Sequence, residues 1–239
     1  MQHSYLYLGL TTEFIFRFSK VLSVVAACTS LVPAGLGIRR WPQLTPALRY
    51  VAWFALVPGA VLSIGAEIGR WVFHYNLAIL AAVTLGEVLL LAGAYARTLH
   101  SDRLRRGLGA ATGLFVVVWC VELGLSLRRN EPVNNYTHIL QTIISIGLAF
   151  SYFEQLLREL PNIRLERDPM FLVSVGACLY YTGSITIFVL EPYMQARAAA
   201  FQIWTMYIIQ SALYILLNGF LALALYYHGR TDGQQQQVR

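Results

Sequence analysis

The chain has 239 residues, of which 57% are apolar and only 13% are charged, and its mean hydropathy is +0.55. An ordinary soluble domain has about a quarter of its residues charged, so this composition predicts a protein of the lipid bilayer. If seven crossings use about 20 residues each, the connecting pieces are roughly a dozen residues long. Pieces of that size exclude a folded kinase, nucleotide-binding or DNA-binding domain.

The formal net charge of +6 does not indicate a nucleic-acid partner. The basic residues lie in short loops between apolar runs, and Lys20 is the only lysine among them. A retinal protein needs a lysine in its last membrane span, and the last apolar run here has none. We therefore expect the lipid bilayer, and no nucleic acid, as the partner of these loops.

Seven apolar runs follow one another along the chain, and each is long enough to cross about 30 Å of hydrocarbon as an α-helix. They cover residues 14–38, 50–68, 74–96, 108–127, 136–157, 170–190 and 201–227. These runs do not alternate between apolar and polar residues, as the strands of a transmembrane barrel do. The sequence predicts an all-α integral membrane protein: a seven-helix bundle over 14–228, a short extracytoplasmic segment 1–13 and a flexible cytoplasmic tail 229–239.

The arginines predict how the bundle is oriented, because basic residues in short loops favour the cytoplasmic side. The loops after the first, third and fifth runs, together with the C-terminal tail, hold most of them, including Arg103, Arg105 and Arg106. The opposite face holds fewer, such as Arg70 and Arg197. This bias predicts an N-terminus outside the cell and a C-terminus in the cytoplasm.

Ionisable residues inside the runs are candidates for function, because each costs a few kcal/mol in hydrocarbon unless it turns inward and finds a partner. Glu87 is the carboxylate that we expect to lie deepest in its run. Asn76 precedes it by about three helical turns, which places both residues on one face of the same helix. Glu154 lies near the end of its run and four residues before Arg158, a spacing that favours an ion pair.

Polar residues also recur at helical spacing. They are His138, Gln141, Thr142 and Ser145 in the run 136–157, and Tyr207, Gln210, Ser211, Tyr214 and Asn218 in the run 201–227. The run 170–190 contributes Tyr180 and Tyr181, and its Gly176 and Gly183 permit the close approach of another helix. Stripes of this period predict helices that face a common interior rather than lipid. Two interpretations stay open, because such residues either join packed helices by hydrogen bonds or line a cavity that opens outward.

Four stretches carry a family resemblance: LGEVLLLAGAYARTL, YTHILQTIISIGLAFSYFEQLL, DPMFLVSVGACLYYTGSITIFVLEPYM and FQIWTMYIIQSALYILLNGFLALAL. In these stretches, over about 47–227, the chain resembles an uncharacterised family of small seven-helix proteins from Bacteroidota-type bacteria. The positions that match its pattern are Glu87, Tyr180, Tyr181, Gly183, Trp204 and Asn218. A histidine of the pattern's last helix is replaced here by polar neighbours such as Tyr207 and Gln210. Genes of this family often lie near sensor histidine kinases, so the resemblance implies a signalling role in a bacterial inner membrane with such a kinase as partner.

The leading hypothesis is a receptor-like membrane sensor. A small apolar or amphipathic ligand, such as a lipid, is expected to enter from the outer side and to shift the packing of the helices. The expected ligand-binding residues are Glu87, Asn76, His138, Gln141, Tyr180, Tyr181, Tyr207, Gln210, Tyr214 and Asn218.

Two alternatives stay open. The first is a small-molecule or proton-coupled transporter in which Glu87 carries the proton or a counter-ion. The second is a membrane-embedded lipid-modifying enzyme built on Glu67, Glu122 and His138, which requires a bound metal. The histidines are scattered, and the sequence has no HExxH, GxSxG or phosphate-loop motif. We therefore expect a binding protein rather than an enzyme, with no catalytic residues, metal or cofactor.

Overall fold

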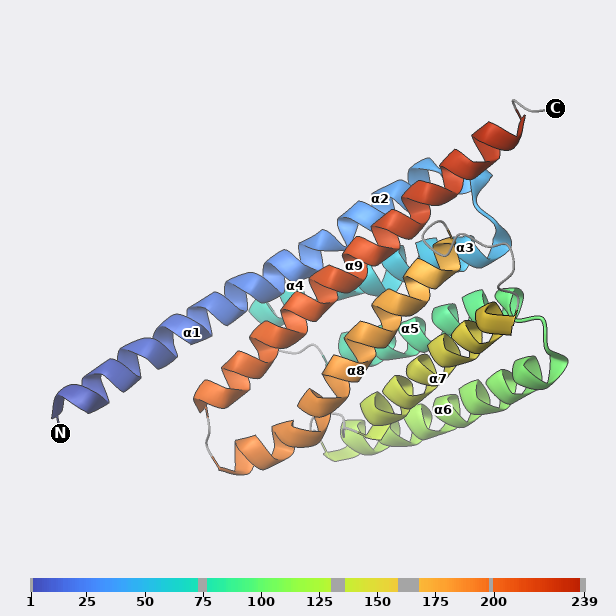
Figure 1. Cartoon of the computed structure of the whole chain (residues 1–239). Coiled ribbons are helices and arrows are strands. Elements are labelled where there is room, and N and C mark those ends of the chain that lie inside the picture. The colour runs from blue at the N-terminus through green and yellow to red at the C-terminus, as the bar shows by residue number, and fades with distance from the viewer. Residues whose placement is uncertain (1, 73–76, 130–135, 159–167, 198–199, 237–239) are drawn as a thin grey trace.

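The computed structural model describes residues 2–72, 77–129, 136–158, 168–197 and 200–236, and no strand is found in these ranges. Figure 1 shows the helices as a bundle of long, roughly aligned rods. In chain order the elements are α1 (Gln2–Thr29), α2 (Leu31–Arg39), the 3-10 turn η1 (Trp41–Gln43), α3 (Pro46–Phe54), the π-helical segment η2 (Ala55–Leu62), α4 (Ser63–Val72), α5 (Leu77–Thr98), α6 (Asp102–Arg129), α7 (Tyr136–Arg158), α8 (Pro169–Ala196) and α9 (Ala200–Gln236).

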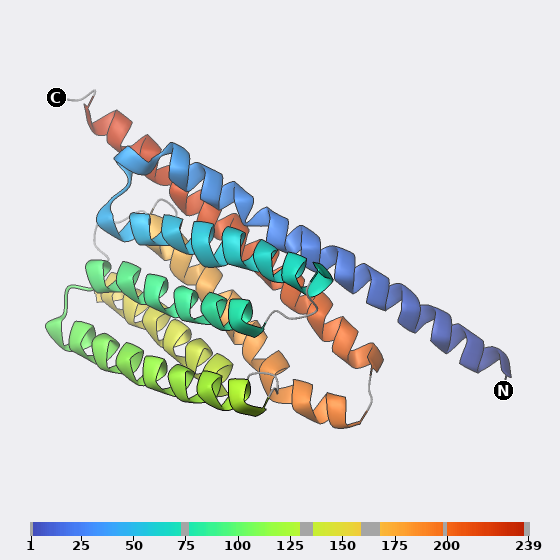
Figure 2. The same cartoon turned by 180° about the vertical axis from the view of Figure 1, so that it is seen from behind.

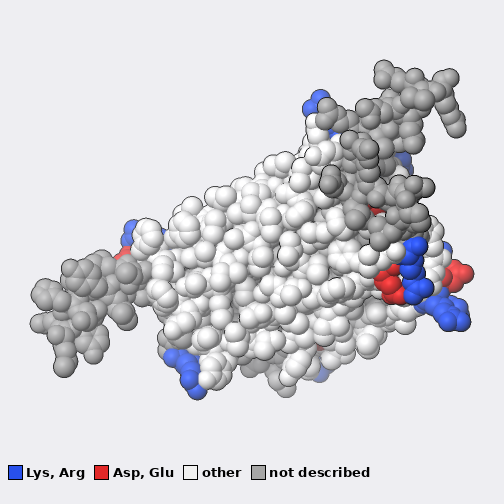
Figure 3. All heavy atoms as spheres, in the orientation of Figure 1, with Lys and Arg blue, Asp and Glu red and all other residues white. Residues whose placement is uncertain are grey.

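The prediction of seven spans is confirmed. Within the described residues, seven helical segments are long and apolar enough to cross a membrane: Glu13–Arg39, Pro46–Ala66, Ile79–Thr98, Asp102–Ser126, Tyr136–Arg158, Pro169–Leu190 and Phe201–Tyr227. The two ends of the chain lie at opposite ends of the bundle (Figures 1 and 2). On the face seen in Figure 3, charged residues gather toward these two ends and the surface between them is uncharged.

The first and the last helix extend beyond the predicted spans. α1 begins at Gln2, so most of the segment 1–13 is helical, and α9 continues through Gln236, so most of the tail 229–239 is helical as well. The predicted ion pair between Glu154 and Arg158 is present, with 2.7 Å between their charged groups, and both side chains are exposed.

Prolines interrupt the first two spans, which the hydrophobic runs alone do not show. Pro58 has no N–H and its ring clashes with the preceding turn, and here the backbone widens into a π-helix between α3 and α4. The hydroxyl of Ser63 donates to the carbonyl that Pro58 presents at this widened turn, at 2.7 Å. In the first span, α1 ends at Thr29 and α2 begins two residues before Pro33.

An apolar core fills the half of the bundle that is farther from the N-terminus. Its buried side chains come from α3, α5, α6, α7, α8 and α9, and they include Val51, Phe115, Val173, Leu221 and Leu225. The predicted close approach at Gly176 is also confirmed, because an added Cβ there would lie 2.8 Å from the Cβ of Phe220 on α9. Side chains fill this half of the bundle, and the cavity described below lies in the other half.

Candidate functional site

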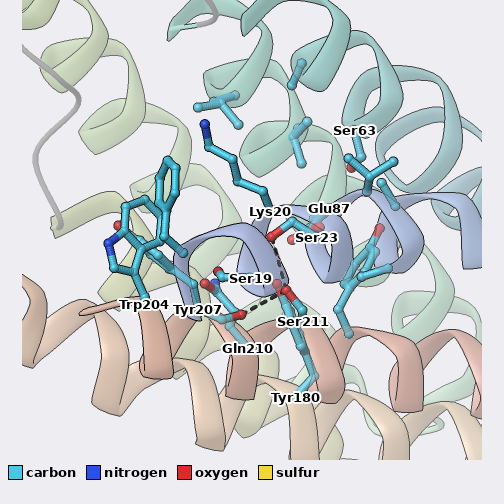
Figure 4. Close-up of a pocket in the computed structure, with 18 residues that line it drawn as sticks. Ser19, Lys20, Ser23, Ser63, Glu87, Tyr180, Trp204, Tyr207, Gln210 and Ser211 are labelled. Carbon is cyan, nitrogen blue, oxygen red and sulfur yellow. Dashed lines mark hydrogen bonds between the residues drawn. The ribbon is translucent and has the colours of Figure 1, made fainter. Parts of the chain in front are cut away.

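A partly open cavity of about 800 Å³ lies between α1, α4, α5, α8 and α9, in the half of the bundle nearer the N-terminus (Figure 4). Its size matches the pockets that bind small molecules, which are typically about 300–1,000 Å³. The wall combines aromatic rings, small apolar residues, serines, one lysine and one glutamate. Such a lining suits a molecule that has both an apolar and a polar part.

Two parallel helices, α1 and α9, form one side of the cavity and contact each other at two levels. Nearer the N-terminus, the rings of Phe16 and Trp204 meet edge to face, with 4.6 Å between their centres. About 10 Å farther along, seven residues on in each helix, the hydroxyl oxygens of Ser23 and Ser211 lie 3.3 Å apart (Figure 4). All four residues line the cavity, so both contacts between α1 and α9 lie at its wall.

Glu87 of α5 brings a buried carboxylate to the cavity wall. The residue is only 6% exposed and lines the cavity. Its Oε2 accepts hydrogen bonds from the Nε2 of Gln141, at 2.5 Å, and from the hydroxyl of Tyr181, at 3.1 Å. The other oxygen, Oε1, accepts no hydrogen bond from a described residue, and it is not among the fully buried polar atoms that lack a partner. Oε1 is therefore the atom with which Glu87 can meet a ligand.

Aromatic rings gather in two groups along the cavity. Beside Glu87, the rings of Tyr180 and Tyr214 lie 5.6 Å apart, and the hydroxyl of Tyr214 donates to the carbonyl of Gly59 at 3.4 Å. Toward the N-terminal end, the rings of Trp204 and Tyr207 lie 5.7 Å apart. The ammonium of Lys20 lies at this end, 4.2 Å from the ring centre of Phe16 on the same helix. The cavity thus has a carboxylate at one end and an ammonium group at the end nearer the N-terminus.

The structure brings together five of the ten predicted ligand-binding residues. Those that line the cavity are Glu87, Tyr180, Tyr207, Gln210 and Tyr214. Four others lie outside the lining: His138, Gln141, Tyr181 and Asn218. Asn76, like the neighbouring His74, lies outside the described residues.

For the run 136–157, the structure favours helix packing over a place in the wall of this cavity. α7 packs against α5 and α8, and its polar face fills that contact instead of facing open space. Gln141 is held by Glu87, and Thr142 and Ser145 are at most 1% exposed. The ring of His138 stacks on Phe188 of α8, with 4.7 Å between ring centres. The helical spacing correctly predicted that this face turns inward, but α5 and α8 pack directly against it, so it does not line the cavity.

Asn218 of α9 and Tyr181 of α8 are also buried in contacts between helices and do not line the cavity. Asn218 lies deeper than the cavity, and its amide donates to the hydroxyl of Thr29 on α1 at 3.1 Å. Tyr181 is 2% exposed and reaches the cavity only through its hydrogen bond to Glu87. Both residues support the site from behind its wall.

The contribution of α1 to the cavity was not predicted from the sequence. Phe16, Ser19, Lys20 and Ser23 line the cavity and recur at i, i+3, i+4 and i+7, which is the spacing of one helix face. The spacing is present in the sequence, but Phe16 is apolar and Lys20 is charged, so the run 14–38 was predicted only as a membrane span. Ser63 of α4 also lines the cavity and was not predicted.

Of the three residues of the enzyme alternative, the structure describes the side chains of Glu122 and His138. The carboxylate of Glu122 accepts hydrogen bonds from the backbone N–H of Thr137, at 2.9 Å, and from its hydroxyl. Glu122 thereby satisfies a donor in the first turn of α7, as a helix cap does. Among the described residues, no group of three His, Cys, Asp or Glu side chains can hold a metal ion, and the side chain of Glu67 is outside them.

Comparison with protein-family models, with curated proteins and with solved structures finds no match to this chain. The fold and the site together define the class: in the described residues, an all-helical protein with seven helices long and apolar enough to span a membrane, and a cavity with a mixed polar and apolar wall in one half of its bundle.

Proposed function

We propose that the protein is a receptor-like sensor of a small amphipathic molecule, oriented with its N-terminus outside the cell. The cavity between α1, α4, α5, α8 and α9 is the observation that carries the proposal. It lies in the half of the bundle that holds the N-terminus, so in this orientation a ligand enters from outside. The arginine-rich loops at the other end then face the cytoplasm.

The chemistry of the wall supports a ligand with a polar end that donates hydrogen bonds. That end lies at Oε1 of Glu87, because a buried carboxylate gains most from a donor or a cation. Its apolar body lies against the rings of Tyr180, Tyr214 and Trp204, which line the cavity. A cationic end gains further from aromatic faces, which attract positive charge.

Signalling requires that the ligand bind two helix arrangements with different affinity. The contacts between Phe16 and Trp204 and between Ser23 and Ser211 join α1 to α9 at the cavity wall. A ligand that separates these residues changes how α9 lies against α1 along its length. At the far end, Arg40 bonds the backbone of α9, so the change reaches the cytoplasmic loops. By the family resemblance, a sensor histidine kinase is the partner that reads this change.

Phenethylamine, a small ring amphiphile with an ammonium group, is a suitable probe. We expect saturable binding to the full chain in lipid nanodiscs, measured as a change in tryptophan fluorescence. Trp204 lines the cavity, so this change is expected to be absent in Trp204→Phe. Glu87→Gln weakens binding by about tenfold or more, because a charge-assisted hydrogen bond is lost. The matched control is Glu154→Gln, in which an exposed carboxylate paired with Arg158 is changed and binding stays the same. Equal binding to all variants, or no saturable binding, contradicts the proposal.

A proton-coupled transporter is the second candidate, and the burial of Glu87 favours it. A carboxylate at the base of a cavity, bonded to Gln141 and Tyr181 of two other helices, is a typical proton carrier. This candidate predicts uptake of phenethylamine into proteoliposomes, driven by a proton gradient and abolished in Glu87→Gln. Binding without uptake supports the sensor, and uptake replaces the sensor by the transporter.

A further inference from the structure

A second, smaller pocket of about 410 Å³ lies at the other end of the bundle, between α2 and α9. Its lining residues are Leu36, Arg39, Arg40, Gln43 and Tyr226. Two adjacent arginines line it, and no described acidic residue does. The pocket is remote from the cavity and shares no lining residue with it.

Arg40 is held in place by α9. Its Nη1 donates to the backbone carbonyl of Leu225, at 3.4 Å, and to that of Tyr226. The guanidinium also lies over the ring of Tyr226, 4.9 Å from the ring centre. A guanidinium has five N–H donors, and these bonds use only one of its nitrogens. Arg40 therefore offers a fixed group of donors to an anion without losing much side-chain freedom on binding.

Arg39 adds a second positive charge beside this fixed one. Its side chain is exposed at the last residue of α2, and Gln43 supplies an amide to the same pocket. Two guanidinium groups with an amide and a phenol match the oxygens of a phosphate, which arginine binds in a bidentate way. The pocket chemistry thus favours a phosphate group.

The surroundings place the pocket at the depth of lipid headgroups. Trp41 and Trp53 meet edge to face, with 5.7 Å between ring centres, and the guanidinium of Arg49 lies 5.8 Å from the ring of Trp41. Tryptophan and arginine are enriched at this level of a membrane protein. Toward the middle of α2 and α9, on the helix faces of Arg39 and Tyr226, apolar side chains are exposed, including Val32, which is 58% exposed, and Leu223, which is 43% exposed. A phosphate bound by Arg39 and Arg40 is therefore next to a surface for acyl chains.

We infer that this pocket binds the phosphate group of an anionic phospholipid whose acyl chains lie along α2 and α9. An anionic lipid fits better than a zwitterionic one, because no described carboxylate lines the pocket to meet an ammonium group. Basic pockets of this kind between membrane helices on the cytoplasmic side bind anionic headgroups. The site is independent of the cavity. Arg40, which lines it, joins the end of α2 to the backbone of α9.

Native mass spectrometry of the full chain in detergent tests the inference with phosphatidylglycerol and phosphatidylcholine of the same acyl chains. We expect phosphatidylglycerol to bind the unchanged protein more tightly, and Arg39→Ala/Arg40→Ala to weaken it by about tenfold or more. The matched control, Arg103→Ala/Arg105→Ala, removes two exposed arginines of α6 and leaves the preference intact. Equal binding of both lipids, or an equal loss in the control, overturns the inference.

Two single variants keep the result interpretable if the double variant folds poorly, and a competition with phosphate identifies the source of the bound group. Arg39→Ala alone removes a side chain with no described hydrogen bond or ion pair, so this variant keeps the fold and is expected to lose part of the preference. Arg40→Lys keeps the charge but not the planar fork of donors, and is expected to bind phosphatidylglycerol more weakly. Millimolar inorganic phosphate is expected to leave the lipid bound. If phosphate displaces it fully, the pocket is a site for free anions and the lipid assignment is wrong.

Discussion

The polar faces of α7 and α9 look alike in the sequence but have different surroundings in the structure. On α7, Ser145 is 1% exposed, and Gln141 is fixed by its bond to Glu87. On α9, Gln210 and Ser211 line a cavity of about 800 Å³. Both faces turn away from lipid, as their helical spacing predicts. The difference is whether the neighbouring helices close over the face, and the spacing of polar residues does not determine that.

Glu87 lies where the two faces meet. Its Oε2 belongs to the packed side, through Gln141 and Tyr181, whereas its Oε1 remains for the cavity. The packed face of α7 therefore has a role in the site, because it fixes a carboxylate that would otherwise be costly to bury. One region positions the group that the other region presents to a ligand.

The largest difference is expected when the same large side chain is placed on each face. Ser145→Phe overpacks the contact between α7, α5 and α8 and destabilises the protein by about 3 kcal/mol or more. Gln210→Phe on α9 places its ring in the cavity, which Gln210 lines without being fully buried, and costs less than about 1 kcal/mol because open space accepts the ring. Unfolding in detergent, followed by loss of helix signal, measures both. Two variants of equal stability would show that the faces are equally packed.

A smaller difference is expected when a glutamine is shortened on each face. Gln141→Ala removes a donor from the buried carboxylate of Glu87 and leaves a void, which costs about 2 kcal/mol. Gln210→Ala enlarges the cavity and changes stability by less than about 0.5 kcal/mol. The same unfolding assay compares the two, and phenethylamine binding serves as a second readout. A larger loss of stability in Gln210→Ala would reverse the assignment of the faces.

The smallest effect is expected at Asn218, the inner end of the α9 stripe. Its hydrogen bond to Thr29 belongs to packing, and bonds of this kind between membrane helices contribute about 0.6 kcal/mol on average. A double-mutant cycle of Asn218→Ala and Thr29→Ala is expected to give a coupling energy of about that size. Phenethylamine binding stays unchanged in both variants. Zero coupling would show that the hydrogen bond contributes nothing to packing, and weakened binding in Asn218→Ala would place Asn218 in the binding site instead.

The seven spans were predictable because membrane thickness and the cost of unpaired backbone groups leave few alternatives for long apolar runs. The burial of Glu87 followed from its depth in a run by the same reasoning. The widened turn at Pro58 was harder to predict, because the run 50–68 is apolar enough to cross the membrane as one regular helix. Which side of the membrane each terminus faces stays a prediction from the arginines.

The cavity was only half predictable from the sequence. Five of its lining residues were expected from α5, α8 and α9, but the wall formed by α1 was not. Helical spacing indicates which face of a helix turns inward, and it contains no information about which distant helix lies opposite. The contacts that join Phe16 to Trp204 and Ser23 to Ser211 link residues that are far apart in the chain. Such pairings depend on the packing of the whole bundle.

The most direct test of the central claim, an open cavity lined by α9 beside a closed contact lined by α7, is the labelling rate of a single cysteine. Ser211→Cys and Ser145→Cys are compared in a chain whose Cys28, Cys120 and Cys178 are replaced by alanine, reconstituted in liposomes and treated with a charged, water-soluble maleimide. The account predicts that Ser211→Cys reacts at least about tenfold faster, because a thiol reacts only where the reagent reaches its thiolate. Equal rates at the two positions, or faster labelling of Ser145→Cys, would contradict it.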